Sequence, residues 1–246
     1  MIVYLNRGLI LEQAVCSLIH NYFDNLRIES KYKNFHISVT TEHPFAELYL
    51  HETLNAADSF PAVVVSTQED SKPAELSDLP VHVSAYELDK NDIQKITMTR
   101  DSDGNEIPGL CSVVDQETLS IINQKIDSKG YVMAVSFRSC HKDNINLEIW
   151  TENNQLKNEI YEQLRLYVTG SFARELEQKY PFHAITCEDT TYQGHRSNNY
   201  NFDFDAVLYG AHISFDVNYM TEQLLIDTDA DNRSSDIITE VINHVK

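Results

Sequence analysis

The residues from His51 to Asn55 read His-Glu-Thr-Leu-Asn and begin like a zinc-binding helix motif. In that motif two histidines stand four residues apart on one helical face, and the glutamate between them acts as general base. Asn55 takes the place of the second histidine, so one imidazole ligand is missing. We therefore expect no metal site at this position.

Two acidic stretches contain the residue types of a calcium-binding loop. Asp227, Asp229 and Asp231 alternate as the first ligands of such a loop do. However, Asn232 stands where the sharp turn needs glycine, and Ile238 where a bidentate glutamate is needed. We expect a solvated acidic loop there, compatible with a weak incidental cation. The second stretch, 101–106, has its glycine too early and is better explained as a turn.

The cysteines favour free thiols. Cys140 and His141 are adjacent, and consecutive residues of a strand point apart, which makes them a poor nucleophile and base pair. Cys16, Cys111 and Cys187 are widely spaced, without a C-x-x-C motif. This spacing supports neither a zinc site nor a disulfide framework.

Recognisable catalytic motifs are missing from the chain. It has no phosphate-binding glycine loop, no G-x-G-x-x-G and no G-x-S-x-G, so nucleotide binding and the commonest hydrolase elbow lack their backbone cradle. We predict no catalytic, cofactor-binding or metal-binding residues, no cofactor, and a protein that is not an enzyme. The 10 histidines keep one alternative open, because two of them can meet in space without any sequence signal. That alternative is a soluble enzyme with an unfamiliar site.

The stretch from Tyr192 to Tyr200 is rich in tyrosine, asparagine and serine. Tyrosine supplies contact area at low entropic cost, while small polar side chains adapt to a partner. We interpret 191–201 as a loop that is either a contact surface or an ordinary surface loop.

Hydrophobic spacing predicts the elements that would position these residues. Apolar residues at helical spacing predict helices over 9–27, from Asp115 to Gly130, and from about 151 to 168. A further short helix is expected within 228–246, after a polar loop. Alternating or continuous apolar runs predict strands at 35–40, 46–51, 60–66, 93–99, 131–137, 145–150, 184–190 and 205–219. The run from Ala62 to Val65 is apolar on both faces, which places its strand near the sheet centre.

Composition and charge restrict the protein's class. Its 246 residues are 42% hydrophobic with 7 Gly and 6 Pro, enough to bury a sizeable core. The net charge of −19 disfavours general binding to nucleic-acid backbones or anionic membranes. No run reaches the roughly 18 apolar residues that cross a bilayer, and Arg7 and Glu12 interrupt the apolar N-terminus. We expect synthesis in the cytoplasm and no membrane association.

The order of the expected elements favours an α+β fold. We predict a mostly antiparallel sheet covered on one face by helices, with long projecting loops. One domain is expected over 1–246, with a loop or hairpin insertion at 67–110, where turn formers and charges concentrate.

The segment from Val132 to Asp227 resembles the tail terminator proteins of tailed bacteriophages, in particular those of contractile tails. Three runs carry the resemblance, Tyr131–Phe137, Ile145–Trp150 and the helix Asn154–Val168, and the long strand Ala211–Tyr219 closes the set. The resemblance covers roughly 95 residues and lies in element order rather than in a residue motif.

The resemblance implies a homohexameric ring that ends tail polymerisation and meets the tail tube, the sheath and the head-side neck proteins. DNA would pass through its lumen without specific binding, and the protein would reside in the virion after assembly in the host cytoplasm. The insertion has no counterpart, which leaves another neck or baseplate adaptor as an alternative. An acidic adaptor that binds a basic partner is consistent with the net charge.

Overall fold

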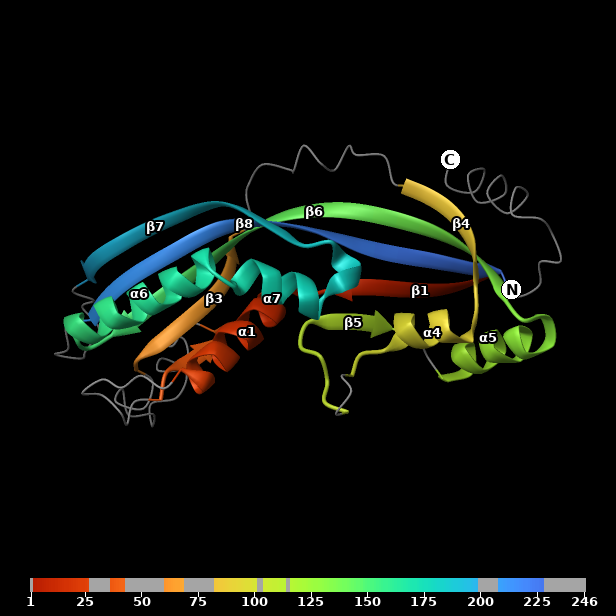
Figure 1. Ribbon diagram of the computed structural model, residues 1–246, viewed down its shortest axis with the longest axis horizontal. Coiled ribbons are helices and arrows are strands. Elements are labelled where there is room, and N and C mark those ends of the chain that lie inside the picture. The colour runs from red at the N-terminus through yellow and green to blue at the C-terminus, as the bar shows by residue number, and fades with distance from the viewer. Residues whose placement is uncertain are drawn as a thin grey trace. The chain divides into compact units, whose positions relative to one another are not determined.

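The chain begins with a strand that its sequence pattern did not predict. In the computed structural model, β1 spans Ile2–Leu9 and α1 follows over Leu11–Asn25. The structure describes residues 2–26, 36–42, 60–68, 82–100, 104–113, 116–198 and 208–227. Figure 1 shows the course of these elements.

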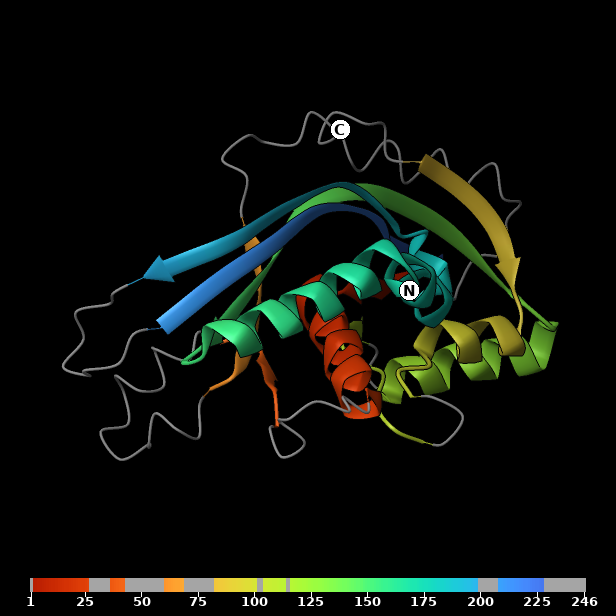
Figure 2. The same ribbon diagram turned by 60° about the vertical axis from the view of Figure 1, so that its left-hand side comes forward.

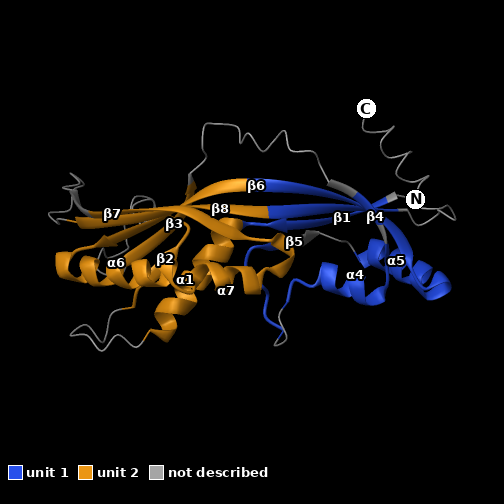
Figure 3. Ribbon diagram, turned by 45° about the horizontal axis from the view of Figure 1, so that its top comes forward, with its two compact units in different colours: residues 1–10, 75–141, 220–246 blue, residues 11–74, 142–219 orange. Residues whose placement is uncertain are grey.

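The chain divides into two compact units, coloured separately in Figure 3. Unit 1 comprises residues 1–10, 75–141 and 220–246, and unit 2 comprises 11–74 and 142–219. Two strands of 20 residues each, β6 (Val132–Thr151) and β8 (Leu208–Asp227), contribute to both units.

Unit 1 contains the strand order β4-β6-β8-β1-β5. The strands β4 (His82–Leu88) and β5 (Leu110–Val113) pair antiparallel with β6 and β1 respectively. The helices α4 (Lys90–Thr97) and α5 (Gln116–Lys129) lie on one side of these strands (Figures 1 and 3). Apolar side chains from both layers form the core, namely Val3, Leu5, Leu88, Ile93, Ile96, Ile122, Ile126, Val132, Ala134, Leu224 and Ile226.

Unit 2 contains the strand order β2-β3-β6-β8-β7. Here β2 (Ser38–Thr40) pairs parallel with β3 (Ala62–Gln68), and the pairs of β3 with β6 and of β7 (Thr186–Asn198) with β8 are antiparallel. The helices α1, α6 (Asn154–Thr169) and α7 (Phe172–Lys179) lie on one side of the strands, as Figure 2 shows for α1 and α6. A short 3-10 helix, η2, spans Pro181–His183.

These elements confirm the predicted α+β class. The predicted helices over 9–27, 115–130 and 151–168 correspond to α1, α5 and α6. Local chemistry explains two of their ends: the Asn153 side chain accepts hydrogen bonds from the backbone N–H groups at the start of α6, and Gly130, with φ 88°, follows the end of α5. β3 lies between β2 and β6, as its two apolar faces predicted.

The strand predicted over 93–99 is wrong, because these residues belong largely to the helix α4. Asp89 and Asp92 form a reciprocal capping box that starts this helix. Ile93 and Ile96 are buried three residues apart, a spacing that places both on one helical face. The spacing of the apolar residues in 93–99 therefore fits a helix as well as a strand.

Two predicted strand boundaries are also wrong. The strands expected at 131–137 and 145–150 are one continuous strand, β6, although its middle is polar. The expected loop over 191–201 instead forms strand as far as Asn198, within β7. Backbone hydrogen bonds to a neighbouring strand do not require apolar side chains, so polar sequences continue as strand where β8 supplies the partner.

Several predictions lie outside the described residues. These are the strand at 46–51, the motif at 51–55, most of the loop from 67 to 80, the cap at Asp115, and the loop and helix over 228–246. The long strand predicted for 205–219 corresponds to β8, which continues to Asp227.

Candidate functional site

A charged side chain interrupts the apolar face of β8 in unit 1. Leu224 and Ile226 belong to the core, and Glu222 is the next residue in the same alternation. Its side chain is only 8% exposed. Burying a carboxylate is costly unless partners replace its hydration, so its neighbours decide what it does.

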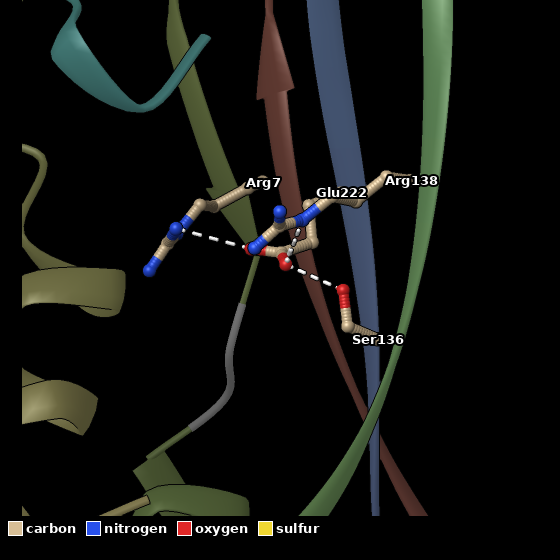
Figure 4. Close-up of polar contacts among 4 residues, drawn as sticks. All are labelled: Arg7, Ser136, Arg138 and Glu222. Carbon is tan, nitrogen blue, oxygen red and sulfur yellow. Dashed lines mark hydrogen bonds and ion pairs between the residues drawn. The ribbon is translucent and has the colours of Figure 1, made fainter. Parts of the chain in front are cut away.

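Three side chains surround the Glu222 carboxylate (Figure 4). Arg7 Nη1 donates to Oε2 at 3.0 Å, and Arg138 Nε donates to Oε1 at 3.0 Å. The Ser136 hydroxyl also donates to Oε1. We refer to Arg7, Ser136, Arg138 and Glu222 as the Glu222 cluster.

The strand register positions this cluster. Arg7 is the Cα partner of Glu222 across the β1–β8 pair. Ser136 and Arg138 share a face of β6, which neighbours β8 on the other side. The apolar residues Leu5 and Leu224 form the next pair along the same face. The cluster therefore connects three strands where the apolar core of unit 1 ends.

This arrangement is suited to holding strands rather than to acid–base chemistry. Both oxygens of the carboxylate already accept hydrogen bonds from charged donors, which are the stronger kind. The Ser136 hydroxyl donates its hydrogen to the carboxylate. To act as a nucleophile, this hydroxyl would have to pass its proton to Glu222, whose two oxygens already accept hydrogen bonds from Arg7 and Arg138.

Unit 2 contains a second charged cluster, formed by Lys142, Asn144 and Asp216. Lys142 Nζ lies 2.8 Å from Asp216 Oδ2, and Asn144 Nδ2 donates to Oδ1 at 2.7 Å. The hydrogen bond to Asp216, with the charges of Asp216, Asp189 and Glu188, raises the pKa of Lys142. Burial alone would raise the pKa of Asp216, but its bonds to Lys142 and Asn144 and the lysine charge lower it. Lys142 and Asp216 thus stabilise each other's charged forms, and their ion pair connects β6 with β8.

The structure separates the side chains of Cys140 and His141. Cys140 is exposed, and His141 Nε2 lies 2.8 Å from the hydroxyl oxygen of Thr221. Both residues belong to β6, where successive side chains point to opposite faces. Cys16, Cys111 and Cys187 are half-buried free thiols, and burial raises the pKa of Cys187 to about 11.

The other residues singled out in the sequence are dispersed. His20 pairs with Asp24 on α1 at 2.9 Å, and His183 is buried in η2. Within the described part of the chain, no group of three or more histidine, cysteine, aspartate or glutamate residues is arranged to hold a metal ion. Asp227 is the last residue of β8, and the rest of that acidic stretch is outside the described residues.

The Glu222 cluster was not predicted from the sequence. A usable signal existed, because Arg7 follows Val3 and Leu5 in one alternation and Glu222 precedes Leu224 in another. A charge at a core position of a strand indicates a buried partner. The identity of that partner, 215 residues away, is set only by the fold.

No family model and no curated protein matches the chain. Among the residues that the structure describes, no helix is both long and apolar enough to cross a membrane.

Proposed function

We propose that the protein is a structural protein of a tailed-phage virion that caps the tail as a terminator ring and connects it to the neck. The observation that carries this proposal is the order β6, α6, α7, β7, β8 in the second half of the chain. This is the region whose element order resembles the terminators, with α7 as an additional helix and β6 as one strand in place of two.

The charged clusters support a role as an assembly component. Glu222 and Asp216 each bind basic side chains of their own unit, which ties neighbouring strands together. A ring subunit needs such a fixed body, because its interfaces must repeat from copy to copy. The net charge of −19 suits a channel wall past which DNA moves without binding. The proposed partners are further copies of the chain, the tail tube, the sheath and the head-side neck proteins.

The mass of the purified protein in solution tests this proposal. We would measure it by light scattering behind a sizing column over a concentration series, alone and with purified tail tubes. A hexamer, alone or on the tube end, is the expected result. Monomer at every concentration together with no binding to tail tube or sheath would overturn the proposal.

An acidic adaptor of the neck or baseplate is the second candidate. The excess of 38 acidic over 19 basic residues favours it, because opposite charge steers a basic partner to the surface. Such binding weakens as salt rises and screens the charges. Pull-down of neck and baseplate proteins at about 0.05 and 0.5 M salt distinguishes the two, since an apolar ring contact should persist at the higher concentration.

A further inference from the structure

The strand β4 forms an edge of unit 1 with an unbroken register. All seven of its residues, His82 to Leu88, pair in sequence with Arg138 to Val132 of β6. Within the described residues, β6 is the only strand that pairs with β4. A regular edge presents backbone N–H and C=O groups to any further strand.

The edge of unit 2 formed by β7 is built differently. Its pairing with β8 shifts register twice, between Glu188 and Thr191 and between Gln193 and Arg196. Asp189, inside the first irregularity, has a φ of 49°. Bulges of this kind twist an edge and hinder strand addition. The pairing of β4 with β6 contains no such bulge.

Apolar side chains extend to β4 on both faces of unit 1. Leu88 belongs to the helix-covered core. On the opposite face, Ala85 packs with the partly buried Met133, Phe137 and Leu225 around Val135. A strand added beside β4 would therefore lie next to an apolar side chain on each face and would extend the hydrogen-bond ladder.

The other end of the strand order in unit 1 is also an edge. β5 pairs with β1 over four residues, Leu110 to Val113 with Leu9 to Asn6, again without a register shift. It pairs with no other strand among the described residues. In the described part of unit 1, β4 and β5 thus form two regular edges at opposite ends of one strand order.

We infer that the β4 edge of one copy binds the β5 edge of a second copy, so that main-chain hydrogen bonds join the subunits. Contact between two different surfaces of the same chain is heterologous, and it closes into a ring when the rotation per subunit permits. This inference rests on the proposed ring. Because each copy carries a net charge of −19, screening by salt should strengthen this association rather than weaken it.

Lysine substitution at the edge tests the inference. Ser84 is exposed on β4, and Ser84→Lys places a charge on one face of the edge strand, next to the side chains of any added strand. Thr190→Lys on β7 is the matched control, since Thr190 is exposed on the irregular edge and the charge change is identical. We expect Ser84→Lys to raise the concentration at half-assembly by at least about tenfold, and Thr190→Lys to leave it unchanged, in light scattering with and without tail tubes.

The outcomes separate the inference from the function on which it rests. If Ser84→Lys assembles like the wild type, the β4–β5 contact is wrong, but the proposed ring is not contradicted. Wild-type monomer, with no binding to tail tubes, would overturn both. If circular dichroism shows that Ser84→Lys is unfolded, Glu87→Lys on the same strand replaces it, because Glu87 is also exposed.

Discussion

The rings of Tyr22 on α1 and Tyr167 on α6 stack with their centroids 4.1 Å apart and their planes 6° from parallel. The Tyr167 hydroxyl donates a hydrogen bond to Glu175 Oε2 on α7 at 2.7 Å. One buried tyrosine therefore connects the helices α1, α6 and α7 of unit 2. Burial raises the pKa of Tyr167 well above its ordinary value, and the bond to Glu175 raises it further.

This relationship predicts a loss of stability in alkali. An unfolded tyrosine ionises near pH 10, whereas folded Tyr167 keeps its proton, so its contribution is complete below about pH 10 and is lost as the pH rises. Tyr167→Phe retains the ring but lacks the ionisable hydroxyl. We expect it to lower the free energy of unfolding by about 1 kcal/mol at neutral pH and to lose less stability above about pH 10. Urea titrations over this pH range measure both effects.

The exposed Tyr4 provides the control for this prediction. Tyr4 is 56% exposed, and Tyr4→Phe should leave the free energy of unfolding at neutral pH as in the wild type. A decline in alkali for Tyr167→Phe as steep as that of the wild type would contradict the assigned role.

The Glu222 cluster predicts that neutralising one buried carboxylate is costly. Glu222→Gln removes the negative charge that compensates Arg7 and Arg138. We expect it to lower the free energy of unfolding by about 3 kcal/mol. Ser136→Ala should cost about 1 kcal/mol. The control Glu87→Gln, at an exposed position of the same unit, should have little effect. Chemical denaturation measures the stability of all three variants. Equal stability of Glu222→Gln and Glu87→Gln would show that Glu222 does not hold β1, β6 and β8 together.

The contact between Gly210 and Trp150 predicts a steric effect. A Cβ at Gly210 would lie 3.0 Å from Cζ3 of the Trp150 ring, so the ring must move. We expect Gly210→Ala to cost about 1–3 kcal/mol and to shift the fluorescence of the chain's 1 tryptophan. At Gly194 the same addition would meet the Tyr161 ring at 3.5 Å, an ordinary contact, so Gly194→Ala should leave the spectrum unchanged. Identical fluorescence spectra for both variants would show that the Trp150 indole is not confined by Gly210.

The capping box of α4 predicts a local effect at the position where the sequence pattern was misleading. Asp89 accepts a hydrogen bond from the backbone N–H of Asp92 at 2.9 Å, and Asp89→Ala should cost about 1 kcal/mol. Asn91→Ala is the control, since Asn91 is exposed in the first turn of α4. Hydrogen exchange of the α4 amides should increase for Asp89→Ala alone, and unchanged exchange would show that the cap does not hold this helix end.

The sequence by itself determined the elements whose signals are local. Apolar residues at helical spacing identified α1, α5 and α6, and continuous apolar residues identified β3 as an inner strand. The α+β class follows from those elements. Each signal depends on residues within one helix or strand, which is why it can be read without the fold.

Only the tertiary structure decided the continuity of β6, the strand character of β7 and the composition of the Glu222 cluster. A polar segment remains strand when a neighbour pairs with its backbone, and that neighbour is distant in the sequence. Arg7 and Glu222 are 215 residues apart, and each alone is only a charge in an apolar pattern. Their pairing depends on the register of β1 against β8, a non-local property that no window of the sequence contains.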